Sequence, residues 1–436
     1  MGYSGGGRGS ALISRAPAAA KDLFAAAPAK SVTTGKAVLA VVAIAAAVTV
    51  GLLRQPGPGA LNTIWAEDGS IFYAEAVDKG PWAALTTSYA GYFHAVPRLL
   101  AAIASVFPPS AAATVLAAGA ALIVALLALL VYVTSAAHLS STVARVVVSA
   151  LVVVVPVAQD EVLNSVANFH WYGLYVLFWV FLWSPRSRIG QVVAVATVLL
   201  VATSDILVLA YVPLALFRFF HKEEGRLGKI LGGALALGLV VQLIGLATGS
   251  SERELDPNPV RAAVGYLLRA VPAPLIGQRW LGHQIGARWV ALAAVAWLLV
   301  AVAFVVALRG LTRPAWVLAG AAVIQSAALY VLPVVLSGVA APRYAVAPAL
   351  LVVVALVALL QPRPGNAVPL YVLAGFLAVI ALINLRIDNP RAHGPAWDAE
   401  LDKARATCVA GATAAIPIAP VETPPWLVQV TCEKLN

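Results

Sequence analysis

Long apolar runs separated by short polar loops are the main feature of this chain. A helix that crosses a bilayer needs about 20 apolar residues, with a range of about 17–25, and eleven runs reach or approach that length. They lie near residues 37–53, 110–133, 143–158, 168–184, 190–204, 206–220, 229–249, 289–308, 315–337, 344–361 and 367–385. The pattern predicts an all-α polytopic membrane protein with about eleven transmembrane helices.

Positively charged residues favour eleven spans over ten. Ser204 and Asp205 split the stretch 190–220 into two short halves, and a single long helix there would lower the count. With eleven spans, the short inner loops hold ten Lys or Arg and the short outer loops hold one, Arg343. Cytoplasmic loops normally carry this excess, and ten spans would put the basic loop 218–229 outside. The charges therefore predict a cytoplasmic N-terminus and an extracytoplasmic C-terminus.

Composition agrees with a membrane location. The chain is 61% hydrophobic and 11% charged, whereas soluble domains carry roughly a quarter charged residues. The net charge of +10 comes from the predicted inner loops and the N-terminal arm, so it is an orientation signal and not the basic surface of a nucleic-acid-binding protein. We expect membrane lipid, and no nucleic acid, around this chain.

Three segments follow from this topology. Residues 1–36 are rich in Gly, Ser and Ala and contain five Lys or Arg, which is typical of a disordered basic arm. Residues 37–385 form the transmembrane domain, and residues 386–436 form an extracytoplasmic tail. Cys408 and Cys432 both lie in this tail, in an oxidising compartment where they can form a disulfide.

The transmembrane domain has two long outer loops, 54–109 and 250–288. In the first we expect one interfacial helix from Ser70 to Lys79, capped by Asp68 or Ser70, and a second that opens at Pro97. The apolar side of the second helix consists of Leu99, Leu100, Ile103, Val106 and Phe107. The second loop has apolar residues at helical spacing with arginines off that face, which predicts an amphipathic helix on the outer membrane surface; these are Val260, Ala263, Val264, Leu267, Leu268 and Val271, with Arg261 and Arg269.

Candidate chemical groups gather in the first outer loop. Glu67 and Asp68 are adjacent acids at the membrane edge, and such a carboxylate can act as a general base on a hydroxyl; the alternative for Asp68 is a helix N-cap. Tyr92 and His94 suit a sugar-binding platform or an interfacial aromatic belt. Arg98 suits a lipid-linked phosphate, or it snorkels from its helix.

Further candidates lie at the outer ends of later helices. Asn168 and His170 begin one apolar run, and Asp205 lies between two short ones, where it either caps a helix or faces a cavity. Arg343 and Tyr344 lie at the end of a short outer loop. Arg343 is the one cation of the short outer loops, which suggests an anionic ligand.

No Asp, Glu, Lys or Arg falls well inside a predicted span, which argues against ion-coupled transport. No spacing matches a zinc site, so we expect no metal site and no cofactor, and dependence on a divalent metal stays open.

Three polar stretches follow the first span: Trp65-Ala66-Glu67-Asp68-Gly69, Tyr89-Ala90-Gly91-Tyr92 and Pro97-Arg98. They resemble the GT-C superfamily of integral membrane glycosyltransferases, in bacterial members that use polyprenyl-phosphate sugars. The resemblance is strongest in residues 62–109 and weaker around residues 168–171, 204–205 and 343–344.

The resemblance implies a sugar transfer on the outer face of a bacterial plasma membrane. The donor would be a polyprenyl-phosphate-linked sugar and the acceptor a cell-envelope glycan or lipid. Asp68, or Glu67 beside it, would be the general base, and arginines such as Arg343 would bind the donor phosphate. Two other functions stay open from the residues: a lipid or sugar exporter (a flippase), and a non-catalytic integral membrane scaffold.

Overall fold

The protein is a mostly helical membrane protein. The computed structural model describes residues 23–24, 33–221, 225–249, 257–281 and 286–435, so most of the predicted basic arm 1–36 and parts of the loop 250–288 lie outside the described residues. Within them, six helical stretches are long and apolar enough to cross a membrane. These are Thr34–Leu53, Pro109–Ala137, Arg226–Thr248, Ala287–Leu308, Trp316–Ser337 and Pro342–Leu359.

Each of the eleven predicted apolar runs coincides with a helix. In chain order they are α2 (Thr34–Leu53), α6 (Ala112–Thr134), α7 (Thr142–Val154), α9 (Phe169–Leu182), α10 (Arg188–Ala202), α11 (Val212–Phe220), α12 (Gly225–Thr248), α16 (Ala287–Leu308), α17 (Trp316–Ser337), α18 (Val346–Leu359) and α19 (Val368–Ile383). The chain breaks where Ser204 and Asp205 predicted a break: α10 ends before them, and a 3₁₀ segment, η5 (Ile206–Tyr211), leads into α11.

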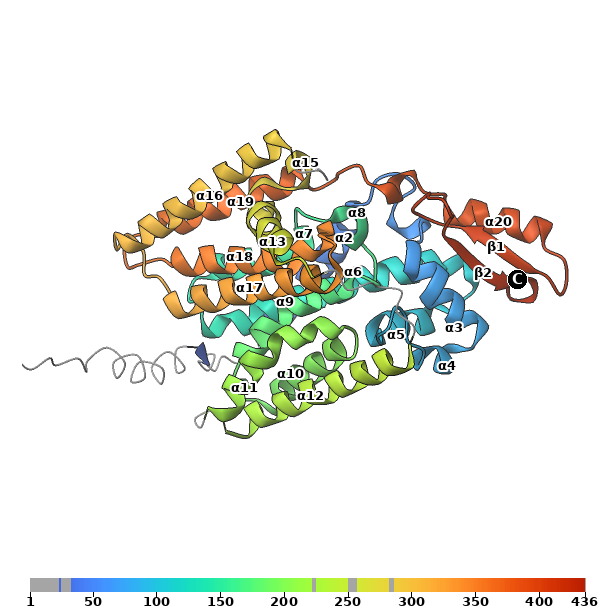
Figure 1. Cartoon of the computed structure of the whole chain (residues 1–436), viewed down its shortest axis with the longest axis horizontal. Coiled ribbons are helices and arrows are strands. Elements are labelled where there is room, and N and C mark those ends of the chain that lie inside the picture. The colour runs from blue at the N-terminus through green and yellow to red at the C-terminus, as the bar shows by residue number, and fades with distance from the viewer. Residues whose placement is uncertain (1–22, 25–32, 222–224, 250–256, 282–285, 436) are drawn as a thin grey trace, which may run out of the picture.

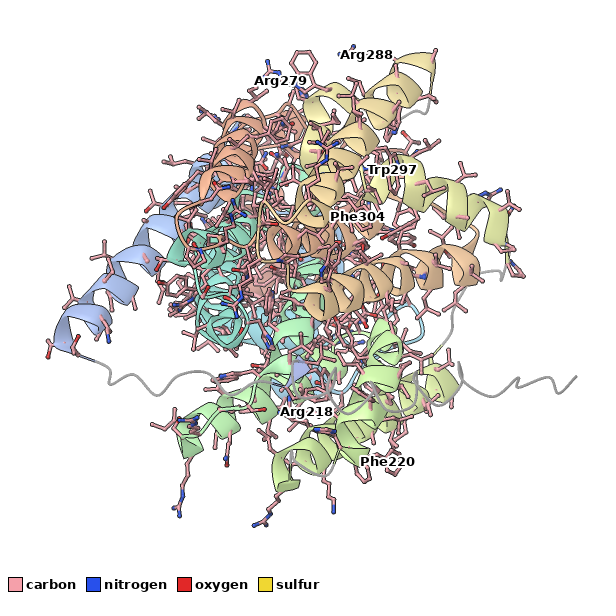
Figure 2. All side chains as sticks on the ribbon, turned by 90° about the vertical axis from the view of Figure 1, so that its left-hand side faces the viewer. Arg218, Phe220, Arg279, Arg288, Trp297 and Phe304 are labelled. Carbon is pink, nitrogen blue, oxygen red and sulfur yellow. A yellow bond between two sulfur atoms is a disulfide. The ribbon has the colours of Figure 1, made fainter. Side chains whose placement is uncertain are left out.

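Helices α9 and α18 form the centre of the bundle. Every residue of both helices is buried, and the two helices pack against each other, with α17 against α18 and α6 against α9. Figure 1 shows α16 and α19 on one edge of the molecule and α10, α11 and α12 on the opposite edge. Large apolar side chains on these edges are exposed, among them Phe220, Trp297 and Phe304 (Figure 2). Apolar surface on this scale marks a lipid-facing protein.

A buried arginine caps the C-terminal end of the central helix α9. Four main-chain carbonyls at a helix C-terminus have no partner within the helix. Arg218, 1% exposed, donates from Nη1 to the carbonyls of Val180 (3.2 Å) and Phe181, and from Nη2 to the carbonyl of Trp183 (2.9 Å). Its guanidinium therefore replaces the water that would solvate this helix end in a soluble protein.

The first outer loop contains short helices, but not with the predicted caps. A π-helical turn, η2 (Asp68–Tyr73), continues into α3 (Ala74–Asp78), and α4 (Pro81–Leu85) follows. The predicted cap is wrong for both candidates: no side-chain capping bond forms at the start of η2, and Ser70 Oγ donates to the carbonyl of Ala66 (3.0 Å).

The second interfacial helix, α5 (Ala95–Ala104), begins two residues before Pro97. Its side chains Leu99 and Ile103 are exposed, in agreement with a face toward lipid. Snorkelling of Arg98 is contradicted, because this residue is 1% exposed and its Nη1 lies 2.8 Å from Glu75 Oε2. Arg98 therefore fastens α5 to α3 inside the loop.

The second outer loop is helical where it is described. It contains α13 (Pro259–Gly265), a π-helical turn η7 (Tyr266–Ala270), α14 (Ala273–Ile276) and α15 (Gln278–Leu281). Val260, Val264 and Leu267 are exposed as the amphipathic pattern predicts, while Val271 is buried.

The C-terminal tail folds as a small unit at one end of the bundle, beside α3 (Figure 1). It consists of α20 (Trp397–Thr407) and an antiparallel hairpin of β1 (Thr413–Pro417) and β2 (Leu427–Thr431), in which Thr413 pairs with Thr431. A disulfide joins Cys408 to Cys432. The tail reaches the first outer loop directly, because Ala419 forms a β-bridge with Trp65.

Replacement of Arg218 by Gln should destabilise the fold. Hydrogen bonds to a charged group contribute about 1.5–3 kcal/mol each, and the substitution leaves buried carbonyls at the end of α9 without donors. We expect a loss of about 3 kcal/mol, measured as a lower thermal unfolding midpoint in detergent. The matched control is Arg309→Gln, because Arg309 is exposed at the end of α16. Equal midpoints for the two variants would contradict the capping role.

Candidate functional site

Five separate segments enclose one cavity of about 160 Å³, here called the main cavity. They are the first outer loop, the stretch 161–171 that leads into α9, the break before η5, the end of α17 and the 3₁₀ turn η8 (Pro342–Ala345). Eight of the residues that the sequence analysis selected line it: Glu67, Tyr92, His94, Asn168, His170, Asp205, Arg343 and Tyr344. The other two, Asp68 and Arg98, do not.

Two groups of aromatic rings line the main cavity. In the first group His94 packs against Tyr92, with ring centroids 4.1 Å apart, and against Phe72 at 5.2 Å. In the second group the ring of Trp171 lies 5.2 Å from that of Tyr344. The rings come from the first outer loop, α9 and η8, so they come together only when these segments meet. Such flat apolar faces suit the apolar face of a sugar ring.

Charged groups also line the main cavity. Arg343 Nη1 pairs with Glu161 Oε2, and the guanidinium lies 5.5 Å from the centroid of the Tyr344 ring. His170 Nε2 lies 3.5 Å from Asp205 Oδ2. Asp205 has both of the roles proposed for it, because its Oδ1 accepts from the Leu207 N–H (2.7 Å) at the start of η5 while the residue lines the cavity.

The adjacent acids Glu67 and Asp68 have different surroundings. Glu67 lines the main cavity, and burial raises its pKa above the ordinary value, an effect that Arg343 partly offsets. Asp68 is 2% exposed, and its carboxylate accepts from the N–H groups of Ala167 (2.7 Å) and Val166 (3.2 Å). Burial raises the pKa of Asp68 to about 7, although the Ala167 N–H and the nearby Arg391 lower it.

The backbone near the main cavity is strained. Ala66, directly before Glu67, has φ 24°, and Ala90, which lines the cavity, has φ 52°. Positive φ is unfavourable for residues other than glycine, and such conformations concentrate at functional sites. The π-helical turn after Glu67 is a further feature that recurs at functional sites.

Sequence reasoning did not select Glu161 or Trp171 as site residues. Both lie in the polar cluster that contains Asn168 and His170, and both line the main cavity. The sequence did contain one indication of Glu161. Arg343 is a lone cation in an outer loop, and such a cation usually pairs with an acidic side chain. Arg391 in the C-terminal tail also went unselected, since no local pattern marks it.

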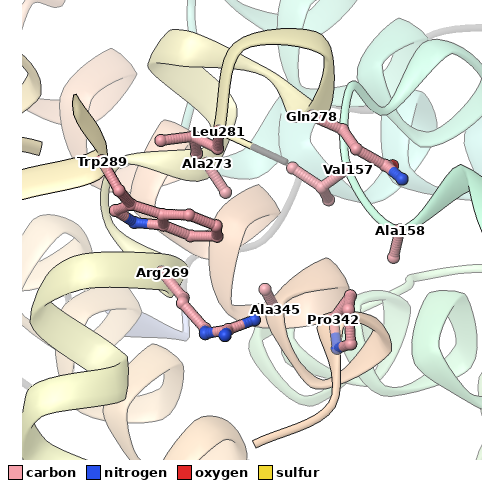
Figure 3. A pocket seen from close by; sticks show the side chains of 9 residues that line it. All are labelled: Val157, Ala158, Arg269, Ala273, Gln278, Leu281, Trp289, Pro342 and Ala345. Atoms are coloured by element: carbon pink, nitrogen blue, oxygen red, sulfur yellow. The ribbon is translucent and has the colours of Figure 1, made fainter. Parts of the chain in front are cut away.

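A second cavity of about 40 Å³ lies next to the main one. Pro342 and Ala345 of η8 line it, while Arg343 and Tyr344 of the same turn line the main cavity. Figure 3 shows the guanidinium of Arg269 below the ring of Trp289 and directed toward Pro342 and Ala345; its centre lies 4.9 Å from the ring centroid. One short turn therefore separates two cavities.

Within the described part of the chain, no group of three or more His, Cys, Asp or Glu side chains is placed to hold a metal ion. Four groups of the main cavity form two pairs, Arg343 with Glu161 and His170 with Asp205.

No protein-family model matches the chain, and no curated protein or solved structure is significantly similar to it.

Proposed function

We propose that this protein is an integral membrane glycosyltransferase that moves one sugar from a polyprenyl-phosphate donor to an extracytoplasmic acceptor, a cell-envelope glycan or lipid. One observation carries the proposal: eight polar and aromatic residues, selected from sequence segments far apart in the chain, line a single cavity. A scaffold without chemistry would give no reason for acids, an arginine and aromatic rings to converge there.

The size and lining of the main cavity favour one sugar ring. Its volume of about 160 Å³ is similar to that of a cavity of about 150 Å³ that holds one benzene ring. The aromatic rings of the lining suit the faces of such a ring, and Asn168, Glu67 and Asp205 offer groups that can bind its hydroxyls.

Glu67 is the proposed general base. It is the catalytic candidate of the first outer loop that lines the main cavity, and its raised pKa brings it closer to neutral pH, where a base works best. Its carboxylate takes the proton of the acceptor hydroxyl, and the hydroxyl oxygen attacks the anomeric carbon. The bond from that carbon to the phosphate oxygen breaks, and polyprenyl phosphate leaves with inversion at the anomeric carbon.

Arg343 is the proposed ligand of the donor phosphate. Its guanidinium has five N–H donors, of which Nη1 faces Glu161. The remaining donors suit a bidentate contact to phosphate oxygens, and they would stabilise the negative charge that grows on the leaving group.

The proposed topology places this chemistry outside the cell. The six long apolar helices are joined by α7, α9, α10, α19 and the η5–α11 unit as shorter spans, which gives eleven. A helix of 14 residues such as α9 is about 21 Å long, shorter than a hydrocarbon core of about 30 Å; if its other end reaches the inner surface, its polar start at Asn168 lies within the outer leaflet. The main cavity would then be sunk into the outer leaflet, within reach of a lipid-linked donor.

The variant Glu67→Gln should lose transfer while it folds normally. General base catalysis contributes about 10²–10⁴-fold, so we expect release of polyprenyl phosphate to fall at least about 100-fold. The control is Asp78→Asn, an exposed acid of the same loop. Normal turnover in the Gln variant would contradict the assignment.

The pH dependence tests the same group independently. A base acts in its ionised form, and burial raises the pKa of Glu67. Turnover should therefore fall as the pH is lowered through a value above 4.5, the ordinary pKa of this group. A rate that stays constant down to pH 4.5 would exclude Glu67 as the base.

The variant Arg343→Gln should weaken donor binding. We expect the KM for the polyprenyl-phosphate sugar to rise about tenfold or more, since hydrogen bonds to a charged group contribute about 1.5–3 kcal/mol. The control is Arg279→Gln, an exposed arginine of the second outer loop. An unchanged dependence of the rate on donor concentration would count against the phosphate role.

A further inference from the structure

The turn 163–167 determines where α9 places its cavity residues. It precedes Asn168, His170 and Trp171, which line the main cavity. Leu163, Val166 and Ala167 are buried, and Asn164 has φ 52°. The turn belongs to neither a helix nor a strand, so its buried main-chain groups need partners from elsewhere.

Arg391 of the C-terminal tail binds the carbonyl side of this turn. It is 3% exposed, and its Nη1 donates to the carbonyls of Leu163 (3.1 Å) and Asn164 (3.0 Å). The same guanidinium donates from Nη2 to the carbonyl of Thr63 (2.7 Å) and from Nε to Thr63 Oγ1 (2.8 Å). Arg391 therefore joins the turn to the first outer loop, four residues before Glu67.

Asp68 binds the amide side of the turn. Its two carboxylate oxygens accept from Ala167 N–H and Val166 N–H, and Ser165 Oγ donates to it at 3.4 Å. Successive residues of a helical turn point in directions about 100° apart. Because Asp68 is directed into the turn, Glu67 is free to face the main cavity.

We infer that Asp68 and Arg391 are positioning residues, which together hold the turn 163–167 by its main chain and so bring Glu67 and the start of α9 to opposite sides of one cavity. The inference rests on the proposed function only for its effect on the reaction; the positioning itself is independent of any activity. The catalytic base and the positioning acid are then two adjacent residues, Glu67 and Asp68.

The chemistry of the turn requires a carboxylate at position 68. An amide of the same shape would direct its NH₂ group, a donor, against one of the two main-chain N–H groups, because only one oxygen remains to accept. Asp68→Asn therefore breaks part of the contact without a change in volume. Likewise Arg391→Lys keeps the charge but loses the planar fork that reaches Leu163, Asn164 and Thr63 together.

Amide hydrogen exchange of the full-length protein in detergent tests the positioning role. In Asp68→Asn, exchange of residues 165–168 should be about tenfold faster or more, as expected for a local opening, while exchange of β1 and β2 stays unchanged. Arg391→Lys should loosen the same turn, and the control Asp78→Asn should not. Unchanged exchange of residues 165–168 in both Asp68→Asn and Arg391→Lys would overturn the inference. An increase in exchange rate spread evenly over the whole chain in both variants would overturn it as well.

The pH profile of transfer separates the two acids. Burial raises the pKa of Asp68 to about 7, so protonation of Asp68 also loosens the turn and slows the wild-type protein as the pH falls. Asp68→Asn should lower kcat and lose this contribution, but its rate should still fall on acidification because Glu67 is protonated. Glu67→Gln should lose the fall that Glu67 produces and leave the exchange of 165–168 unaltered. A rate of Asp68→Asn that no longer depends on pH would show that Glu67 is not the base and would overturn this division of roles. If no variant and no wild-type protein transfers sugar, the proposed function fails, and the exchange experiment still decides the positioning role.

Discussion

The structure depends on one constraint: buried main-chain N–H and C=O groups that lie outside the hydrogen bonding of helices and strands must find other partners. In lipid no water can satisfy them, and an unpaired buried group costs about 1–3 kcal/mol. Three buried arginines meet this requirement: Arg218 at the end of α9, Arg391 at the turn before α9, and Arg54, which donates to the carbonyls of Val153 and Val155 (2.7 Å) at the end of α7. These three guanidinium groups donate to main-chain carbonyls, whereas the buried Arg98 pairs with the carboxylate of Glu75.

The same constraint shapes the main cavity. Asp68 supplies the acceptor that the arginines cannot, and with Arg391 it holds the turn before α9 from both sides. The C-terminal tail is part of this arrangement, since Arg391 belongs to it and Ala419 pairs with Trp65 beside Glu67. The C-terminal tail does not line the cavity, but through these contacts it supports the first outer loop and the turn before α9, which do.

Much of this architecture was accessible from the sequence because it is local. Apolar runs predict helices through their length, and Ser204-Asp205 predicted the break before η5. The gathering of His170, Asp205 and Arg343 followed from placing all three at the outer ends of helices. The direction of a side chain does not follow in this way. Whether Arg98 meets lipid or Glu75, and whether Asp68 faces a cavity or the amides of Val166 and Ala167, depends on backbone up to about a hundred residues away.

The proposed transfer of sugar in the main cavity can be tested directly. The purified protein is placed in lipid vesicles with a panel of polyprenyl-phosphate sugars and envelope acceptors, and the lipid products are analysed by mass spectrometry. We expect that at least one donor is converted to free polyprenyl phosphate with its sugar on an acceptor. Recovery of every donor intact, whether on its original side or moved unchanged across the membrane, would contradict it.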